Sequence, residues 1–232
     1  MKIISIEGNI GTGKTTFIEL IKNTFCERFP EKRVVFLKEP VDQWIEMKDD
    51  STGENILGVF YKDQQRWSYS FQMNAFITRM KLIESVLNAH GIYNKSHADA
   101  CTDLILIMER SVYTDRNVFA TLLHESNKIS SLEWKLYDQW FSWLVQKCDY
   151  CLPTHYFYLN ASADTSYQRM LKRNRNEEGG VSLDYLRMVE EKHNTWLCSI
   201  DTMSEWDANI DFEHSEAQKE KMRVKLSAIC DE

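Results

Sequence analysis

The sequence predicts an α/β protein in which helices flank a central parallel sheet. Three observations predict this fold class. Short apolar runs alternate along the chain with long stretches of helical periodicity, which is the pattern of βαβ units. Three of the eight glycines fall between positions 8 and 13, directly after the first apolar run. With 43% apolar and 27% charged residues, the composition is that of an ordinary globular protein.

The elements can be read in chain order. Four runs are expected to be buried strands, at residues 3–6, 34–37, 104–108 and 156–159. Two apolar stripes follow helical spacing, the first at Phe17, Leu20, Ile21 and Phe25 and the second at Trp134, Tyr137, Phe141 and Leu144. Both stripes are expected to be core or subunit-interface faces.

The other segments carry weaker signals. Residues 91–102 and 174–182 lack periodicity and are expected to be loops. A last strand within 201–207 is poorly supported, because this segment alternates badly and contains three acidic residues. From 205 to 220 acidic residues outnumber basic ones, which predicts a solvated, partly helical surface. Since the 232 residues contain no repeat or linker, we expect 1–232 to form a single domain.

Charge and composition exclude several classes of protein. The chain has 28 basic and 35 acidic residues, and this net charge of −7 leaves no basic face for a nucleic-acid partner. The longest apolar run is only Leu104 to Met108, far short of the roughly 20 residues that cross a membrane. Six cysteines do not form a dense disulfide framework, and residues 1–7 resemble no secretory or mitochondrial presequence, so a cytoplasmic location is expected. Cys148 and Cys151 have redox or zinc spacing, but without a second pair we expect ordinary thiols.

The glycine-rich segment from Gly8 to Thr15 predicts a phosphate-binding loop. It fits G-x-x-x-x-G-K-[ST] and lies between a predicted strand and a predicted helix, as the mechanism requires. Glycines let successive backbone N–H groups surround a phosphate, while the helix N-terminus presents partial positive charge to it. Lys14 can reach the β- and γ-phosphates, and the Thr15 hydroxyl can ligate Mg²⁺. The predicted ligand is a nucleoside triphosphate.

The acceptor must be read from the residues that follow the other strands. Ligands of open parallel sheets bind beyond the carboxyl ends of the strands. Glu39 follows the second predicted strand, Glu109 and Arg110 follow the third, and Asn160 follows the fourth. Two strands therefore deliver a carboxylate to the expected site.

Five motifs in order now suggest a family. They are GNIxxGKT from Gly8, EPVxxW from Glu39, RWSxxFQ from Arg66, ERSVYxDR from Glu109 and RxRNEE from Arg173. Over nearly the whole chain, to about Leu197, the sequence resembles the deoxynucleoside kinase family. The resemblance implies a P-loop kinase fold with a short Arg-rich lid at about 169–182. It also implies an enzyme of nucleotide salvage that uses ATP with Mg²⁺ to phosphorylate the 5′-hydroxyl of a deoxynucleoside.

The resemblance also implies roles for individual residues. Glu39 is the expected base for the 5′-hydroxyl, and Arg110 is expected to hold the 5′-oxygen and the transferred phosphoryl group. Lys14, Arg169 and Arg173 complete the catalytic set. Thr15 and Glu109 are the expected contributors to the Mg²⁺ shell. The expected ATP-binding residues are Gly8, Asn9, Ile10, Gly11, Thr12, Gly13, Lys14, Thr15, Thr16, Arg169, Arg173, Arg175, Asp211 and Phe212.

A nucleoside is flat and uncharged, so its pocket should be aromatic with a few hydrogen-bonding groups. By the same resemblance, Glu178 and Tyr61 are expected to bind the sugar 3′-hydroxyl. The full set of expected substrate-binding residues is Glu39, Trp44, Phe60, Tyr61, Phe71, Gln72, Arg79, Arg110, Asp115, Phe119 and Glu178.

Arg79 bears on substrate choice. A buried arginine needs a carboxylate partner, and Asp115 is the candidate. In the family this combination occurs in members that accept deoxycytidine or purine deoxynucleosides, so thymidine is expected to be a poor substrate. The choice among the remaining deoxynucleosides stays open.

Two other functions remain to be separated from this one. A nucleoside monophosphate kinase has the same phosphate loop, but its acceptor carries a phosphate that Glu39 would repel. A non-catalytic nucleotide-binding subunit would not need its base, metal ligand or lid arginines, all of which are present. The family usually forms homodimers, and Trp134 and Trp140 lie on a helix-rich segment that suits such an interface.

Overall fold

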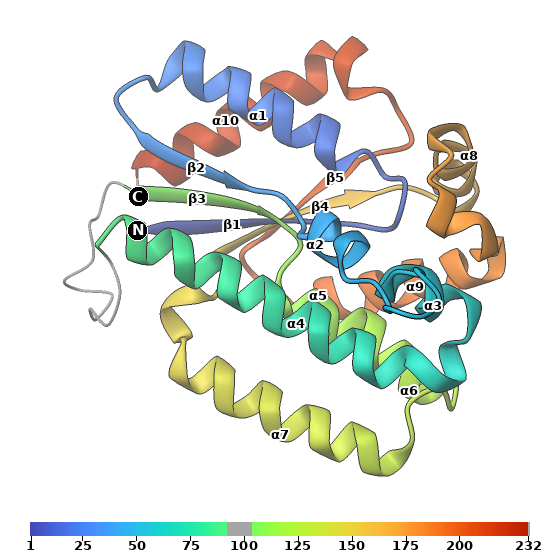
Figure 1. Ribbon diagram of the computed structural model, residues 1–232. Coiled ribbons are helices and arrows are strands. Elements are labelled where there is room, and N and C mark those ends of the chain that lie inside the picture. The colour runs from blue at the N-terminus through green and yellow to red at the C-terminus, as the bar shows by residue number, and fades with distance from the viewer. Residues whose placement is uncertain (92–103, 232) are drawn as a thin grey trace.

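The computed structural model describes residues 1–91 and 104–231, and its described strands form one parallel sheet (Figure 1). The strands are β1 (Lys2–Glu7), β2 (Arg33–Leu37), β3 (Leu104–Glu109), β4 (His155–Asn160) and β5 (Met203–Asp207). Their order is β2-β3-β1-β4-β5, and every pairing is parallel. The predicted fold class and the four predicted strands are confirmed. Because the strands are parallel, their carboxyl ends share one edge of the sheet.

Helices cover both faces of the sheet (Figure 1). One face carries α1 (Lys14–Arg28) and α10 (Glu216–Asp231). The other carries the longer helices α4 (Gln64–Ala89) and α7 (Ser131–Lys147), with α5 (Val112–Thr114), the π-helix η1 (Asp115–Ala120), α6 (Thr121–Glu125) and α9 (Leu183–Leu197) beside them. The remaining elements are α2 (Val41–Glu46), α3 (Ile56–Lys62) and α8 (Ala163–Arg173), and the short 3₁₀ turns η2 (Asp149–Cys151), η3 (Asn176–Gly180) and η4 (Phe212–His214).

The strand sequences divide between two core layers because successive side chains of a strand point to opposite faces. Ile4 and Ile6 pack with the apolar faces of α1 and α10, whereas Ile3 packs with those of α4 and α7. Strands buried on both faces need continuous apolar runs, which is why residues 3–6 and 104–108 could be recognised. In the predicted helical stripes Phe17, Ile21, Phe25, Tyr137 and Phe141 are buried.

The acidic segment after residue 205 corrects one expectation. Residues 205–220 were expected to form a solvated, partly helical surface. The helix α10 does begin within them, at Glu216, but Trp206, Ala208 and Phe212 are buried against α1. Trp206 lies on the edge strand β5, and its ring centroid is 5.4 Å from that of Phe17. Glu205, Asp207 and Asp211 are exposed, and Trp206 is the one buried residue of β5, so the apolar signal of this strand is too weak to be recognised in the sequence.

The predicted loop at 174–182 contains the single turn η3, whereas the loop predicted at 91–102 lies outside the described residues except for Gly91. In the described ranges there is no cluster of three or more His, Cys, Asp or Glu side chains suited to a metal ion. None of the described helices is long and apolar enough to cross a bilayer.

Candidate active site

The phosphate-binding loop connects β1 to α1, at the carboxyl edge of the sheet. Gly8, Gly11 and Gly13 all have positive φ angles, a conformation that side chains rarely permit. At Gly8 an added Cβ would lie 2.8 Å from the Leu159 carbonyl oxygen, so the close approach of β4 also requires glycine. The loop therefore has the curled backbone that the sequence motif predicts.

Lys14 is buried at the centre of this loop. Its Nζ donates to the carbonyl oxygens of Gly8 at 3.2 Å and Asn9 at 2.7 Å. Burial, together with the positive charge of Arg110, lowers the pKa of the Lys14 amine to about 7. An additional anion beside this amine would stabilise its protonated form.

Thr15 and Glu109 meet at the mouth of the loop. The Thr15 hydroxyl lies 3.4 Å from Glu109 Oε2, although the two residues come from α1 and the end of β3. A hydroxyl and a carboxylate beside a phosphate-binding loop are the hard oxygen ligands that Mg²⁺ takes in nucleotide sites. The two residues therefore fit the predicted metal.

Glu39 lies between two arginines. Its carboxylate accepts hydrogen bonds from Arg110 Nη1 at 2.9 and 3.2 Å and from Arg79 Nη2 at 2.9 Å. Burial alone would raise the pKa of Glu39, but the charges of Arg110, Arg79 and Lys14 outweigh it and hold the pKa well below its usual value. The carboxylate is therefore ionised across the physiological pH range.

Arg79 lies at the centre of this charge cluster and binds two of its carboxylates. Its Nε donates to Asp115 Oδ2 at 2.9 Å, so the predicted partner is present, and its Nη1 donates to the Glu109 carbonyl at 2.9 Å. Burial lowers the pKa of Arg79, but Asp115 and Glu39 more than offset it and keep the guanidinium charged. The contact with Glu39 was not foreseen, because sequence patterns do not reveal that α4 passes the end of β2.

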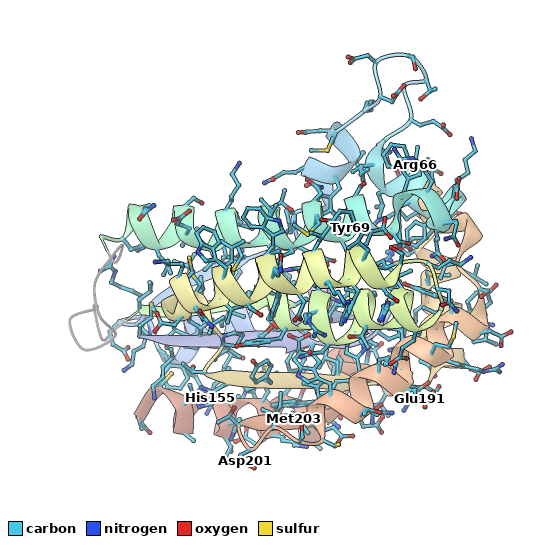
Figure 2. All side chains as sticks on the ribbon, turned by 90° about the horizontal axis from the view of Figure 1, so that it is seen from below. Arg66, Tyr69, His155, Glu191, Asp201 and Met203 are labelled. Atoms are coloured by element: carbon cyan, nitrogen blue, oxygen red, sulfur yellow. The ribbon has the colours of Figure 1, made fainter. Side chains whose placement is uncertain are left out.

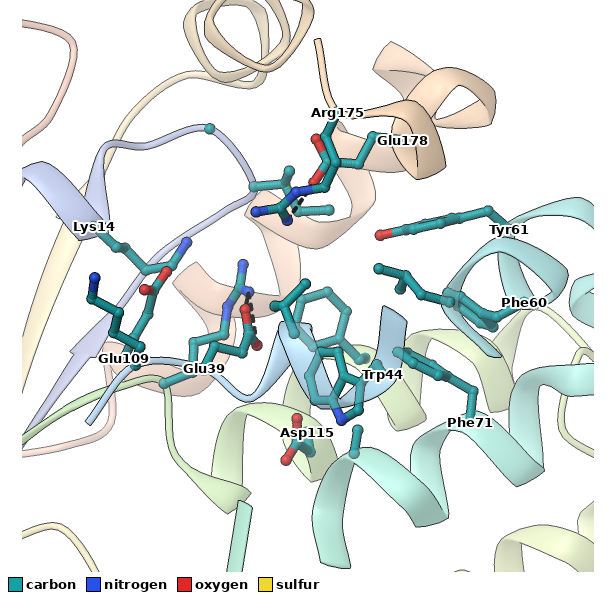
Figure 3. A pocket seen from close by; sticks show the side chains of 18 of the residues that line it. Lys14, Glu39, Trp44, Phe60, Tyr61, Phe71, Glu109, Asp115, Arg175 and Glu178 are labelled. Atoms are coloured by element: carbon teal, nitrogen blue, oxygen red, sulfur yellow. Dashed lines mark hydrogen bonds and ion pairs between the residues drawn. The ribbon is translucent and has the colours of Figure 1, made fainter. Parts of the chain in front are cut away.

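Beside Glu39 lies a cavity of about 230 Å³ (Figure 3). Its wall is aromatic. The Phe60 and Phe71 rings stack with their centroids 4.5 Å apart, and Trp44 meets Phe71 edge-on with the ring centroids 5.3 Å apart. Gln72 is buried in this wall, and its Oε1 has no hydrogen-bond partner among the described residues. Such an orphaned acceptor is costly in a folded protein unless a ligand or water satisfies it.

Most of the predicted substrate residues line this cavity. They are Glu39, Trp44, Phe60, Tyr61, Phe71, Gln72, Arg110, Asp115, Phe119 and Glu178. Arg79 does not line it, because its guanidinium is covered by Asp115 and Glu39. Tyr185 of α9 lines the cavity without having been predicted, since an aromatic residue after a loop carries no local signal of a site.

A second cavity, of about 350 Å³, lies on the other side of the loop. Its lining includes the following predicted ATP residues: Gly11, Thr12, Gly13, Lys14, Thr15, Thr16, Arg169, Arg173, Asp211 and Phe212. Of the other predicted ATP residues, Ile10 and Arg175 line the first cavity instead, while Gly8 and Asn9 present their carbonyl oxygens to Lys14. Lys14, Thr15 and Glu109 line both cavities and therefore stand between them.

The arginines of the predicted lid already have partners. Arg173 donates to both oxygens of Glu178 at 2.6 Å, and Arg175 donates to Glu178 Oε1 at 3.1 Å. Arg169 instead donates to the Ala208 carbonyl at 2.5 Å. Glu178 is buried, lies beside Arg175 (Figure 3) and also lines the first cavity, where it was expected to bind the sugar.

Comparison with known proteins finds similarity to deoxynucleoside kinases. The family model described as deoxynucleoside kinase matches residues 4–231. Human deoxycytidine kinase is 32% identical over 99% of this chain and 92% of its own length. The mitochondrial deoxyguanosine kinase of Xenopus laevis is 30% identical over 99% of this chain and 89% of its own length. A probable deoxycytidine kinase of fowlpox virus is 37% identical over 84% of this chain and 72% of its own length.

Proposed function

The chain belongs to the deoxynucleoside kinase family, and we propose that it transfers the γ-phosphate of ATP to the 5′-hydroxyl of a deoxynucleoside for nucleotide salvage. One observation carries the proposal: Glu39 lies beside an aromatic cavity that shares Lys14, Thr15 and Glu109 with the cavity of the phosphate loop. A nucleoside in the first cavity and a triphosphate in the second would meet at this boundary.

In the proposed reaction the 5′-oxygen forms a bond to the γ-phosphorus, while the bond to the β–γ bridging oxygen breaks and ADP leaves. Glu39 takes the 5′-proton, since its depressed pKa keeps it unprotonated before the reaction. Arg110, Lys14, Arg169 and Arg173 supply positive charge for the transferred group and the phosphates. Phosphoryl transfer has a loose transition state, so positioning and charge contribute most of the acceleration.

Thr15 and Glu109 would hold Mg²⁺, whose bound charge neutralises phosphate oxygens in this class of reaction. Thr15 and Glu109 both line the second cavity, and the Thr15 hydroxyl lies 3.4 Å from the Glu109 carboxylate at the end of β3. Asp211 and Phe212 flank the same cavity and are proposed to contact the donor base.

We propose that deoxycytidine or a purine deoxynucleoside is preferred over thymidine. The Arg79–Asp115 ion pair supports this preference, because Asp115 lines the aromatic cavity and is held there by the buried Arg79 guanidinium. By the family resemblance, members that accept thymidine carry smaller or apolar residues at these positions, which leave room for the 5-methyl group of thymine. Glu178 and Tyr61, on the opposite wall, are proposed to bind the sugar 3′-hydroxyl.

The protein is proposed to act as a homodimer in the cytoplasm, with residues 1–232 as one domain and 169–182 as its lid. The apolar side chains Leu132, Trp140 and Trp143 of α7 are at least half exposed, which supports an interface there. Trp134 contributes less, because it stacks on His124 within the same chain.

A phosphorylation panel tests the proposal. With Mg-ATP as donor, kcat/KM would be measured for the four natural deoxynucleosides, their ribonucleoside counterparts, thymidylate and deoxycytidylate. The expected result is turnover of deoxycytidine or a purine deoxynucleoside, a lower value for thymidine, and none for the two monophosphates. Preferred use of thymidine would refute the substrate preference, and phosphorylation of only the monophosphates would refute the function.

A further inference from the structure

Glu7 is a buried carboxylate that the proposed mechanism does not use. It is the last residue of β1, it is fully buried, and it lines neither cavity. Burial raises its pKa, although three hydroxyl groups and the charge of Arg110 act in the opposite direction. A buried acid with this many partners calls for an explanation beyond packing.

The partners of Glu7 come from two segments of the chain. Ser5 Oγ donates to Oε1 at 2.6 Å from within β1. From the segment after β3, Ser111 Oγ donates to Oε1 at 3.0 Å and Thr114 Oγ1 donates to Oε2. The same Thr114 oxygen accepts the backbone N–H of Ser111 at 3.1 Å. Glu7 therefore ties the start of the phosphate loop to the turn that follows Arg110.

Arg110 directly precedes that turn and has an unusual backbone conformation. Its φ angle is 61°, in the left-handed region that residues with a side chain rarely occupy. Such a conformation persists only where the surrounding structure fixes it. Here the Arg110 N–H donates to the Ile6 carbonyl at 3.0 Å, and the next residue, Ser111, is held by Glu7.

The left-handed turn directs the guanidinium toward the site. Arg110 Nη1 binds Glu39, and Nη2 donates to the Gly8 carbonyl at 3.2 Å, one residue beyond Glu7. We propose that Glu7, acting through Ser111 and Thr114, is a positioning residue that holds Arg110 between the base and the phosphate loop. The inference rests on the proposed function, because it assigns Glu7 a role in the step that Arg110 serves.

The test compares four variants with the wild-type enzyme. Glu7→Gln replaces one acceptor oxygen by a donor, Thr114→Val removes the hydroxyl at equal volume, and Thr114→Ser restores it. Thr24→Val is the matched control, since Thr24 is also a buried threonine, but among the described residues its hydroxyl binds the Leu20 carbonyl alone, at 2.9 Å within α1.

We expect Glu7→Gln and Thr114→Val to lower kcat by about tenfold or more, because small displacements of a positioned group reduce the rate strongly. Both KM values should stay within about threefold. Thr114→Ser should recover most of the rate, and Thr24→Val should retain the wild-type kcat.

The pH profile provides a readout that a purely structural role would not change. The charged groups facing Glu39 are Arg110 directly after β3, Arg79 on α4 and Lys14 on α1, and each lowers the pKa of Glu39. If Arg110 moves away, the pKa of Glu39 rises, so the acidic limb of kcat/KM should move to higher pH in Thr114→Val.

The proposal is overturned if Glu7→Gln and Thr114→Val lose only thermal stability while kcat and the acidic limb stay unchanged. It is also overturned if Thr24→Val loses as much kcat as Thr114→Val. Where Glu7→Gln does not fold, the two Thr114 variants decide alone. An inactive wild-type enzyme in the nucleoside panel would instead count against the proposed function.

Discussion

At the scale of single residues, the site is a compact set of buried charges. Glu39 and Asp115 both bind Arg79, and Arg110 binds Glu39 from the other side. Removing one member of such a set leaves its partner charged and unpaired, which costs several kcal/mol. Individual residues of the cluster therefore determine both the stability and the chemistry of the site.

Lys14 gives a prediction at this scale. The pKa of its amine is about 7 in the free protein, so at pH 8 the amine is mostly neutral. Triphosphate oxygens beside it would raise that pKa, so ATP binding should take up close to one proton at pH 8. Calorimetry in buffers of different ionisation enthalpy measures this uptake.

The matched variant is Lys14→Arg, whose guanidinium stays charged both before and after ATP binds. It should bind ATP at pH 8 without proton uptake. Uptake that is equal in both proteins would mean that another group titrates.

Residue types and spacing predicted most of the site, but not all of its contacts. The phosphate loop could be assigned because its glycines, Lys14 and Thr15 are adjacent in sequence. The contacts of Arg79 with Glu39 and of Glu7 with Thr114 span 40 and 107 positions. Contacts at such separations depend on the packing of helices against the sheet, which a single sequence does not encode in a local pattern.

At the scale of elements, burial determined what could be predicted. The strands β1 and β3 are covered on both faces and were identified from their apolar runs. The edge strand β5 buries only Trp206 among its five residues, so its sequence resembles a polar loop. Its strand conformation depends on the parallel pairing with β4, from Tyr156 with Met203 to Asn160 with Asp207.

Helix α7 carries a capping box that can be tested at this scale. Ser130 Oγ accepts the Glu133 N–H at 3.3 Å, and Glu133 Oε2 accepts the Ser130 N–H at 2.8 Å. Ser130→Ala should lower the free energy of unfolding by about 1 kcal/mol, while Ser130→Asp, which keeps an acceptor, should lower it less. Urea denaturation at a fixed protein concentration measures both, and equal stability of Ser130→Ala and wild type would contradict the assignment.

At the scale of the whole molecule, α7 exposes large apolar side chains on one face of the sheet. Figure 2 views the molecule from the side of α4 and α7. On α7, Trp140 and Trp143 are 50% and 51% exposed and meet edge-on at 5.9 Å. Large apolar side chains gathered on one helix are typical of protein interfaces.

Sedimentation tests the proposed dimer. The wild-type protein should sediment at twice the chain mass of 27.4 kDa, and Trp140→Glu should sediment as a monomer. Val224→Glu is the control, because Val224 is 62% exposed on α10, which covers the opposite face of the sheet. A monomeric wild type, or dissociation by Val224→Glu alone, would contradict an interface on α7.

The most direct test of the account is the turnover of Glu39→Gln with the best deoxynucleoside and Mg-ATP. Glutamine keeps the size of the side chain but cannot take a proton, so kcat should fall at least about 100-fold. Both KM values should change far less, because the cavity walls remain. A variant that keeps kcat within threefold of the wild type would show that the 5′-hydroxyl is activated elsewhere.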